Sequence, residues 1–369
     1  MGFKCGIVGL PNIGKSTLFN AITRTVKAEA ANYPFCTIDP NSAVINIKDF
    51  RLQNLASIAG SAELIPNTLE IVDIAGLVKG ASTGEGLGNK FLSNIREVDA
   101  IIHLVRAFED PDITHVEGHI NPLRDIDIIN TELIFSDLES VTFRIEKNSK
   151  KLKQGEKEVV LMDSILRKSK LVLEKGLLAR SVLPDLSNDD EVKIFKTLNL
   201  LTSKPMIYVS NVSESDIKSG NGMSRSVDEF AKSVGSSSAT ISVKIEADIS
   251  QISDESETLS YLEMFDLKES GLNGVVRSGF EILDLITYFT IGPKEAHAWT
   301  VKKNTTAPKA AGVIHTDFES GFIRAEVISY DDYIKHGGEQ GCKDSGKMRL
   351  EGKEYIVQDG DIMHFRFAN

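Results

Sequence analysis

The sequence has few cysteines, no long apolar run and no excess of basic residues. Its 369 residues include only three cysteines, Cys5, Cys36 and Cys342, and none forms a C-x-x-C pair. This spacing predicts reduced thiols and argues against a disulfide scaffold or a zinc site. No apolar stretch approaches the roughly 18 residues of a membrane span, and the first strand leaves no room for a signal or transit peptide. We therefore expect a soluble, cytoplasmic protein.

The charge is acidic. Asp and Glu outnumber Lys and Arg by 53 to 42, which gives a formal net charge of −11. Such a chain is not expected to coat nucleic acid non-specifically, so any RNA contact requires a local basic surface. The length and the 41% hydrophobic content predict two or three domains with substantial cores.

A phosphate-binding motif lies near the amino end. Residues 9–16, G-L-P-N-I-G-K-S, fit the P-loop pattern G-x-x-x-x-G-K-[ST]. An apolar strand precedes the motif and a helical pattern follows it, which argues against a chance match. The start of a helix offers unpaired N–H groups to a triphosphate, and the glycines let the backbone come close. In this motif Lys15 reaches the β- and γ-phosphate oxygens, and the Ser16 hydroxyl ligates Mg²⁺.

Further positions fit an NTPase. The sequence D-I-A-G begins at Asp73, directly after an apolar strand, where the carboxylate can hold Mg²⁺ through water and the Gly76 N–H can sense the γ-phosphate. Thr37 lies where a GTPase-like switch supplies a second hydroxyl to Mg²⁺, although an ordinary loop threonine is the alternative. The glycine-rich residues 77–89 suit a second switch, and a long surface loop is the alternative.

The base-reading element departs from the guanine-specific pattern. GTPases of this class use N-K-x-D at the end of a later strand, where this chain has N-V-S-E at 211–214. Val212 lacks the long stem that covers the base. Glu214 is one methylene longer than the aspartate that accepts two hydrogen bonds from guanine. The interpretation is a purine site that follows Asn211, without guanine discrimination, which makes adenine plausible.

Periodicity divides the chain into segments. Strands alternate with helical patterns up to about residue 130 and again over 202–285, ending in an apolar helix over about 272–285, which predicts a mostly parallel α/β sheet. Apolar residues at heptad spacing predict an antiparallel two-helix arm between these parts, with a turn at 154–155. Within the arm, residues 144–180 hold 11 basic against 5 acidic residues, which fits either a solvated surface or contact with a polyanion. Short strands after 286 predict a small α+β domain.

Together these motifs resemble the Obg-like ATPases, known as YchF in bacteria, of the translation-factor class of P-loop proteins. The match covers essentially the whole chain, through residues 1–12, 32–40, 73–96, 211–214, 245–249 and 296–367. The resemblance implies a GTPase-like Rossmannoid domain (1–130 and 202–285), a helical coiled-coil arm (131–201) and a ubiquitin-like TGS domain (286–369). It also implies slow hydrolysis of ATP, preferred over GTP, and action on the ribosome, with Mg²⁺ as cofactor and potassium as a further candidate.

The resemblance implies specific site residues. The residues expected to bind nucleotide are Asn12, Ile13, Gly14, Lys15, Ser16, Thr17, Phe35, Thr37, Asn211, Val212 and Glu214. The residues expected to hold the metal are Ser16, Thr37 and Asp73. The residues expected to act in catalysis are His115, Lys15 and Gly76.

The residue at position 77 bears on the expected rate of ATP hydrolysis. Leu77 stands where Ras-like enzymes place a water-orienting glutamine, so hydrolysis should be slow unless another group takes over. The resemblance indicates His115 for that role, and a structural or surface histidine is the alternative.

Two other functions stay open. A P-loop kinase would transfer the γ-phosphoryl group to a small molecule, but it would need an arginine-rich lid and an acceptor pocket. A nucleotide-gated ribosome-binding module would hydrolyse ATP only incidentally. The expected partner is the ribosome, either the large subunit or the whole particle, with contact to tRNA or rRNA. No membrane partner is expected, and the chain is expected to be a monomer.

Overall fold

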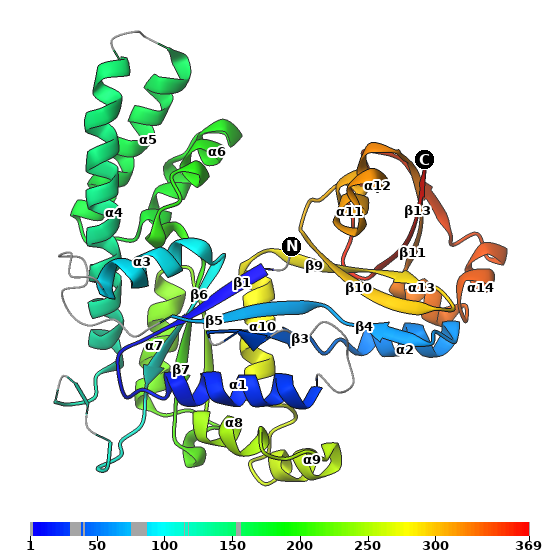
Figure 1. The fold of residues 1–369 in the computed structure, drawn as a ribbon, viewed down its shortest axis with the longest axis horizontal. Helices are drawn as coiled ribbons and strands as arrows, with labels where there is room; N and C mark the ends of the chain where they lie inside the picture. The colour runs from blue at the N-terminus through cyan, green and yellow to red at the C-terminus, as the bar shows by residue number, and fades with distance from the viewer. Residues whose placement is uncertain are drawn as a thin grey trace.

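The computed structural model describes residues 3–29, 38–39, 41–74, 87–113, 115–116, 118–152 and 156–368. Two β-sheets and a projecting helical arm make up the described molecule (Figure 1). Among these residues, no helix is long and apolar enough to cross a membrane.

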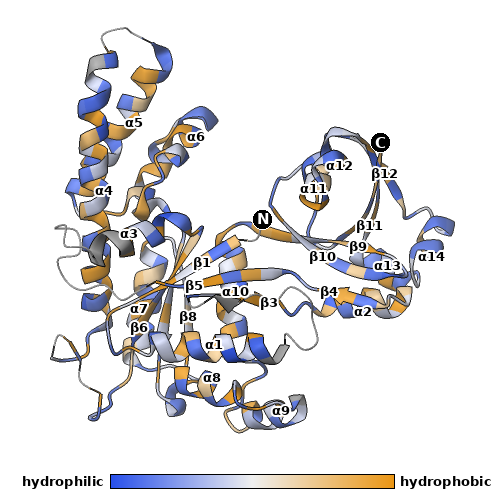
Figure 2. Ribbon diagram, viewed as in Figure 1, coloured by the Kyte–Doolittle hydropathy of each residue, from blue (hydrophilic) through white to orange (hydrophobic). Residues whose placement is uncertain are grey.

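The first sheet has, within the described residues, seven strands in the order β2-β3-β5-β1-β6-β7-β8. The strands are β1 (Phe3–Val8), β2 (Ile38–Asp39), β3 (Ser42–Asn46), β5 (Thr68–Asp73), β6 (Ala100–Arg106), β7 (Met206–Asn211) and β8 (Ser237–Ile241). Five are parallel, and β2 and β3 extend one edge in antiparallel pairing. Every residue of β6 and β7 is buried, as expected for parallel strands covered on both faces. The α/β fold class is confirmed, and Figure 2 shows apolar residues along these central strands.

Helices cover this sheet and contribute to its core. They are α1 (Lys15–Glu29), α3 (Leu87–Glu97), α7 (Gly222–Ser233), α8 (Val243–Ile249) and α10 (Gly271–Ile282), with α9 (Glu255–Glu263) following α8. The last apolar helix ends at Ile282, not near residue 285 as the sequence predicted. Asp284 has a φ of 53°, outside the helical region, and Leu285 already begins the next strand.

The arm is built on α4 (Pro122–Leu152) and α5 (Lys157–Glu174), which run antiparallel, with α6 (Asp189–Thr197) beside them (Figure 1). Val141 and Leu166, two of the predicted heptad residues, are buried in its core. The helix α4 begins at Pro122, before the predicted arm boundary, since proline suits a first helical position. Its first turns belong to the core of the first sheet through Ile126 and Ile129. The predicted turn at 154–155 lies outside the described residues.

The second sheet has, among the residues described, the strand order β12-β11-β13-β9-β10-β4. Its strands are β4 (Glu63–Ile65), β9 (Leu285–Ile291), β10 (Glu295–Lys302), β11 (Phe322–Ser329), β12 (Arg349–Glu351) and β13 (Asp361–Phe367). Its helices are α11 (Ala307–Ile314), α12 (Thr316–Ser320), α13 (Tyr330–Lys335) and α14 (Glu339–Asp344). This sheet with its helices is the α+β unit that the sequence predicted.

An early segment of the chain packs with this late unit. The strand β4 pairs in parallel with β10, and α2 (Phe50–Ala59) buries Leu52 and Leu55 against residues such as Phe289. From the sequence, residues 50–65 are expected in the nucleotide domain, as part of 1–130. No helix or strand was assigned to these residues from the sequence, and a local pattern carries no information on which sheet a strand joins.

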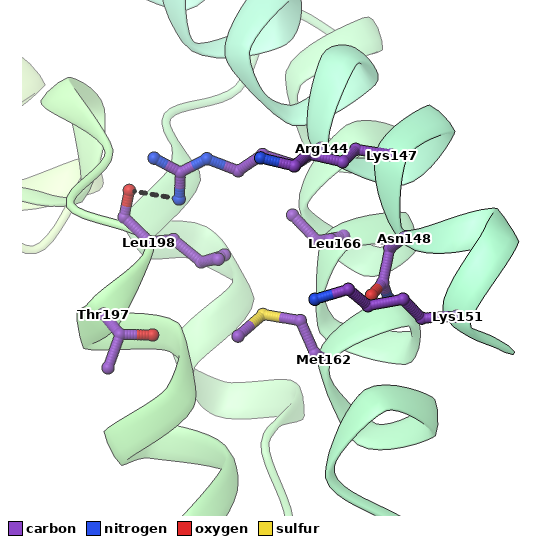
Figure 3. Close-up of a pocket in the computed structure, with 8 residues that line it drawn as sticks. All are labelled: Arg144, Lys147, Asn148, Lys151, Met162, Leu166, Thr197 and Leu198. Carbon is purple, nitrogen blue, oxygen red and sulfur yellow. Dashed lines mark hydrogen bonds between the residues drawn. The ribbon is translucent and has the colours of Figure 1, made fainter. Parts of the chain in front are cut away.

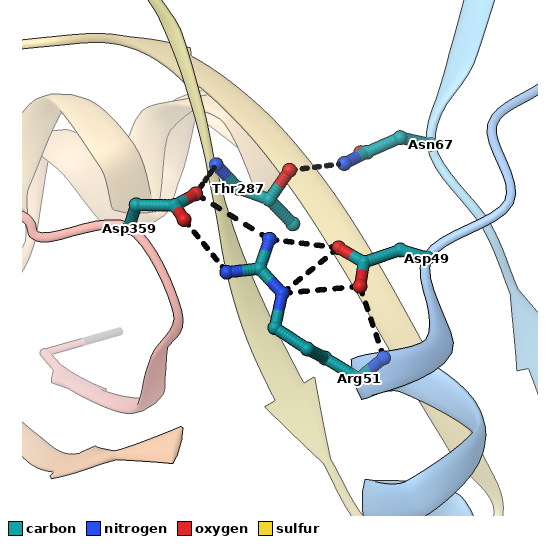
Figure 4. Close-up of polar contacts among 5 residues, drawn as sticks. All are labelled: Asp49, Arg51, Asn67, Thr287 and Asp359. Carbon is teal, nitrogen blue, oxygen red and sulfur yellow. Dashed lines mark hydrogen bonds and ion pairs between the residues drawn. The ribbon is translucent and has the colours of Figure 1, made fainter. Parts of the chain in front are cut away.

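Arg51 holds this segment in place (Figure 4). Its guanidinium donates to Asp49, with Nε–Oδ1 at 3.0 Å, and to Asp359, with Nη1–Oδ2 at 2.6 Å. Asp359 also accepts the Thr287 N–H at 2.9 Å, and Asn67 donates to the Thr287 hydroxyl at 2.9 Å. Burial lowers the pKa of Arg51, but the hydrogen bonds to both carboxylates outweigh it and raise the pKa above its ordinary value.

Replacing Arg51 with alanine should lower the free energy of unfolding by about 1–2 kcal/mol, because two carboxylates lose charged hydrogen bonds in a partly screened setting. Urea unfolding measures this loss. Arg277→Ala is the matched control, since Arg277 and Glu269 form a pair with 58% and 46% side-chain exposure. The control should change stability by less than about 0.5 kcal/mol. Equal losses in both variants would contradict the assignment.

Candidate nucleotide-binding site

The loop between β1 and α1 has the backbone of a phosphate cradle. Asn12 and Gly14 have positive φ angles of 62° and 95°. A Cβ at Gly9 would lie 2.6 Å from the Leu104 carbonyl oxygen, and one at Gly14 would lie 2.8 Å from Nδ2 of Asn211. Glycine is therefore required at position 9 by the Leu104 carbonyl and at position 14 by the Asn211 side chain and the positive φ. The first N–H groups of a helix such as α1 have no partner within the helix and can bind an anion.

Lys15 and Asp73 meet at this loop. The Lys15 ammonium forms an ion pair with Asp73, and the two side chains are only 10% and 21% exposed. The pairing follows from the fold, because β1 and β5 are parallel neighbours with Ile7 opposite Asp73. Their carboxyl ends therefore lie at the same edge of the sheet, where ligands of α/β proteins bind.

The remaining P-loop side chains divide by exposure. Asn12, Ser16 and Thr17 are exposed, whereas Ile13 is 1% exposed and belongs to the core. The Ser16 hydroxyl and the Asp73 carboxylate are hard oxygen donors, which Mg²⁺ prefers. The described residues contain no group of three or more His, Cys, Asp and Glu that could hold a metal. A cation here would therefore need further oxygen ligands, such as those of a phosphate.

Asn211, the last residue of β7, connects two sides of the site. Its Nδ2 donates to the Ile13 carbonyl at 2.9 Å, and its Oδ1 accepts the Val243 N–H at 3.0 Å. The side chain thus ties the P-loop to the start of α8, and it is 4% exposed. Because the backbone engages both polar atoms, Asn211 positions the P-loop.

The positions after Asn211 differ in accessibility. Val212 is 2% exposed, and its N–H donates to the Ile241 carbonyl at 2.8 Å. Glu214 is more open, and its Oε2 accepts from Nζ of Lys244 at 2.9 Å. The Lys244 ammonium therefore competes for the carboxylate that would otherwise be a free double acceptor, the group that guanine recognition requires.

His115 is buried at the start of the arm. Its side chain is 3% exposed, and Nε2 lies 2.8 Å from Oδ2 of Asp125, in the first turn of α4. Arg124 contacts the other oxygen of the same carboxylate at 3.3 Å. This arrangement fixes the imidazole inside the protein. To reach a phosphate-bound water, His115 would have to leave Asp125.

Arg106, which was not expected from the sequence, organises the loop that leads to His115. This residue ends β6 and is 1% exposed. Its guanidinium donates to the carbonyl oxygens of Phe108, Asp110 and Ile113 at 3.1, 3.1 and 2.9 Å. The sequence signal is only a cation at the end of an apolar strand, which does not reveal its three acceptors.

Four of the predicted positions cannot be placed. Phe35, Thr37, Gly76 and Leu77 lie outside the described residues. The described part of the site is thus the P-loop, Asp73 and the segments that follow β6, β7 and β8.

Glu246, a buried residue of α8, links this helix to the start of α10. It is 5% exposed, and its Oε1 accepts the N–H of Gly271, the first residue of α10, at 2.7 Å. Burial raises the pKa of Glu246 to about 7, although the hydrogen bonds from the start of α10 act in the opposite direction. The carboxyl group therefore titrates near neutral pH.

Comparison with known proteins gives matches over the whole chain. Residues 4–138 match a family model described as a 50S ribosome-binding GTPase. Residues 285–368 match the model YchF-GTPase_C, described as a protein of unknown function. The ribosome-binding ATPase YchF of Haemophilus influenzae is 54% identical over 367 residues, covering 100% of this chain and 99% of that protein. The Bacillus subtilis protein of the same name is 50% identical and covers 100% of both chains.

A solved structure also matches nearly the whole chain. The YchF GTPase of Schizosaccharomyces pombe superposes with a TM-score of 0.86 at 39% sequence identity. The alignment covers 99% of this chain and 98% of that one. The similarity therefore extends over the first sheet, the arm and the C-terminal sheet together.

Changing Asn211 to aspartate removes the Nδ2 group that donates to the Ile13 carbonyl and leaves the side chain otherwise similar in shape. The carboxylate can still accept the Val243 N–H, but it meets the Ile13 carbonyl without a proton and buries a charge. The free energy of unfolding should fall by about 1–3 kcal/mol. The P-loop amides should also lose protection from hydrogen exchange. Asn188→Asp is the control, because it caps α6 at the surface and aspartate caps equally well. Unchanged stability of Asn211→Asp would refute the bridging role.

Replacing Glu246 with glutamine should remove a pH dependence. The folded pKa of about 7 lies above the ordinary value of 4.5, so the folded state binds this proton more tightly. The stability from this group is complete below pH 4.5 and is lost as the pH rises toward 7. The loss amounts to at most about 3 kcal/mol.

Urea unfolding at several pH values measures this effect. The difference in unfolding free energy between the wild type and Glu246→Gln should shift against the wild type as the pH rises through that window. Glu263→Gln, at an exposed position of α9, should give a constant difference. Parallel curves for Glu246→Gln would show that the carboxyl group does not titrate in this range.

Proposed function

The chain belongs to the YchF family, and on this basis we propose that it binds ATP at the P-loop, hydrolyses it slowly to ADP and phosphate, and acts on the ribosome. The relatives are named ribosome-binding ATPases, which supports both parts of the proposal. The similarity spans the whole chain, so it includes the parts outside the nucleotide site that would contact a partner.

The observation that carries the proposal is the meeting of Lys15 and Asp73 beside open N–H groups. In the proposed complex the Lys15 ammonium leaves Asp73 and pairs with the β- and γ-phosphate oxygens. The N–H groups at the start of α1 bind the same anion, together with the exposed Asn12 and Thr17. Gly9 and Gly14 keep the loop in this conformation, because a side chain at either position would collide with the protein.

The residues present fit Mg²⁺. The Ser16 hydroxyl and the Asp73 carboxylate, with Thr37 from the undescribed stretch, would hold it. When bound, Mg²⁺ would neutralise negative charge on the phosphate oxygens. We propose potassium near Asn12 as a further cofactor.

Hydrolysis is proposed to be slow because no glutamine stands at position 77. His115 is the candidate to position the attacking water, with the Gly76 N–H at the γ-phosphate. The present pairing of His115 with Asp125 implies that the loop held by Arg106 rearranges first. Such a rearrangement itself contributes to slow turnover.

The base site supports ATP over GTP. Val212 offers no long stem over the base, and Lys244 competes for the Glu214 carboxylate. Guanine would leave its two donors without a free acceptor, which is costly in a partly closed site. Adenine has no such pair of donors to satisfy. We place the base beside Asn211, Val212 and Glu214, with Phe35 from the undescribed stretch.

We also propose how the chain divides into domains. Residues 1–130 and 202–285 bind the nucleotide, 131–201 form the arm, and 286–369 form the C-terminal unit. The separate apolar cores of these parts support it. We add residues 50–65 to the C-terminal unit, because they contribute to its core and its sheet.

Calorimetry with ATP, GTP and ADP in the presence of Mg²⁺ tests the proposal, followed by phosphate release and sedimentation with ribosomes. ATP should bind more tightly than GTP, and the labelled γ-phosphate should appear as free phosphate. Lys15→Ala should reduce turnover by roughly 100-fold or more, because it removes a cation from the transferring phosphate. Lys27→Ala, the same change at an exposed position of α1, should leave turnover unaltered.

A preference for GTP would contradict the account of the base site. A phosphorylated metabolite in place of phosphate would identify a kinase. Ribosome association that ignores the nucleotide state, in the wild type and in Lys15→Ala alike, would leave a binding module without a switch.

A further inference from the structure

The arm contains a small cavity between α4, α5 and α6, with a volume of about 200 Å³ (Figure 3). Two kinds of residue dominate its lining. Cationic side chains come from α4, and apolar side chains come from α5 and the end of α6. They are Arg144, Lys147 and Lys151, and Met162, Leu166 and Leu198.

The cations come from a single helix face. Arg144, Lys147 and Lys151 are spaced by three and four residues, so they share one face of α4. Arg144 donates to the Leu198 carbonyl at 2.8 Å, which fixes one wall. Lys147 and Lys151 are exposed, and no ion pair holds either of them within the described chain. Figure 3 shows the Lys151 side chain extending over the cavity toward Met162.

The floor is apolar and held in place. Leu166 and Leu198 are each 1% exposed and belong to the arm core, and Met162 is packed against it. Asn148 donates to the Val159 carbonyl at 3.2 Å, which fastens α4 to α5 beside the cavity. No Asp or Glu is among the lining residues of this fully described pocket. A merely solvated lysine surface would have neither the concavity nor this floor.

We propose that this arm pocket binds one nucleotide of single-stranded RNA. The phosphate pairs with Lys147 and Lys151, and the base or ribose lies on Met162 and the leucines. Phosphate contacts supply affinity, while an apolar surface accepts the face of an unstacked base. The volume of about 200 Å³ admits one base or ribose, with its phosphate at the mouth beside the lysines, and a rigid duplex could not enter it. The inference deepens the proposed action on the ribosome and rests on it.

Fluorescence anisotropy with a short labelled oligouridylate and the full-length chain tests the proposal. The double variant Lys147→Glu with Lys151→Glu should bind at least about tenfold more weakly. The slope of log affinity against log salt concentration should also be shallower, by the amount that about one to two lost phosphate contacts would cause. The matched control is Lys157→Glu with Lys175→Glu, which makes the same charge change at exposed arm positions outside the pocket. The affinity of this control variant for the RNA should fall by less than about threefold.

Met162→Trp fills the pocket without changing the charge, and it should weaken binding by about tenfold. Thermal unfolding checks that the arm of each variant is intact, and Lys147→Gln with Lys151→Gln is the milder pair if it is not. Equal losses in the two charge-reversed pairs, or full binding by Met162→Trp, would overturn the pocket. Displacement of the RNA by equimolar uridine monophosphate would instead identify a site for a free nucleotide.

Turnover of ATP separates this inference from the proposed function. The pocket variants should hydrolyse ATP at the wild-type rate, since the pocket lies outside the nucleotide site. Oligouridylate binding that depends on Lys147 and Lys151 would support the pocket even if sedimentation showed no ribosome association. Ribosome association that the double variant retains in full, together with unchanged oligouridylate binding, would refute the pocket alone.

Discussion

The side-chain amide of Asn211 is the interaction on which the nucleotide site depends. It satisfies the Ile13 carbonyl and the Val243 N–H at the same time, in a position with almost no exposure. A backbone carbonyl left unpaired in such a place would be costly, so the P-loop and the start of α8 keep a fixed separation. Gly14 follows from the same contact, because Nδ2 of Asn211 occupies the space of a Cβ. Asn211 thus joins the P-loop to the segment that we propose holds the base.

A second set of contacts joins this site to the arm. Asp137, on α4, accepts the N–H groups of Leu201 and Thr202 at 2.8 Å, where the chain returns from the arm. Lys204 follows and donates to the Val98 carbonyl at 2.6 Å, just beyond the end of α3. Burial raises the pKa of Asp137, against the effect of these hydrogen bonds. The helix that follows the glycine-rich stretch is therefore fastened to the base of the arm.

Much of this could be predicted from the sequence, because apolar runs and the P-loop pattern are local. The strands of the first sheet other than β2, the motifs that contain Lys15 and Asp73, and the YchF resemblance all follow from such signals. The contacts of Arg106 could not be predicted, because their acceptors are carbonyl oxygens of a nearby irregular loop whose path no local pattern specifies. The pair Glu214–Lys244 could not be predicted, because it joins segments brought together by folding. The same holds for β4, whose short pattern is compatible with either sheet. The start of α4 at Pro122 was also not predicted, because the heptad spacing of apolar residues in the arm becomes regular only later in the helix.

Because α4 is one unbroken helix, a small tilt at its first turns moves its far end by a larger distance. Its 31 residues form a single helix, about 45 Å long at 1.5 Å per residue. Its root, up to Leu133, is packed in the core of the first sheet, and roughly 30 Å extends beyond that fulcrum. A tilt of about 5° at the root would therefore carry the far end by some 2–3 Å. Displacements too small to disturb the packing around Ile129 thus become large enough, at the other end, to make or break a hydrogen bond.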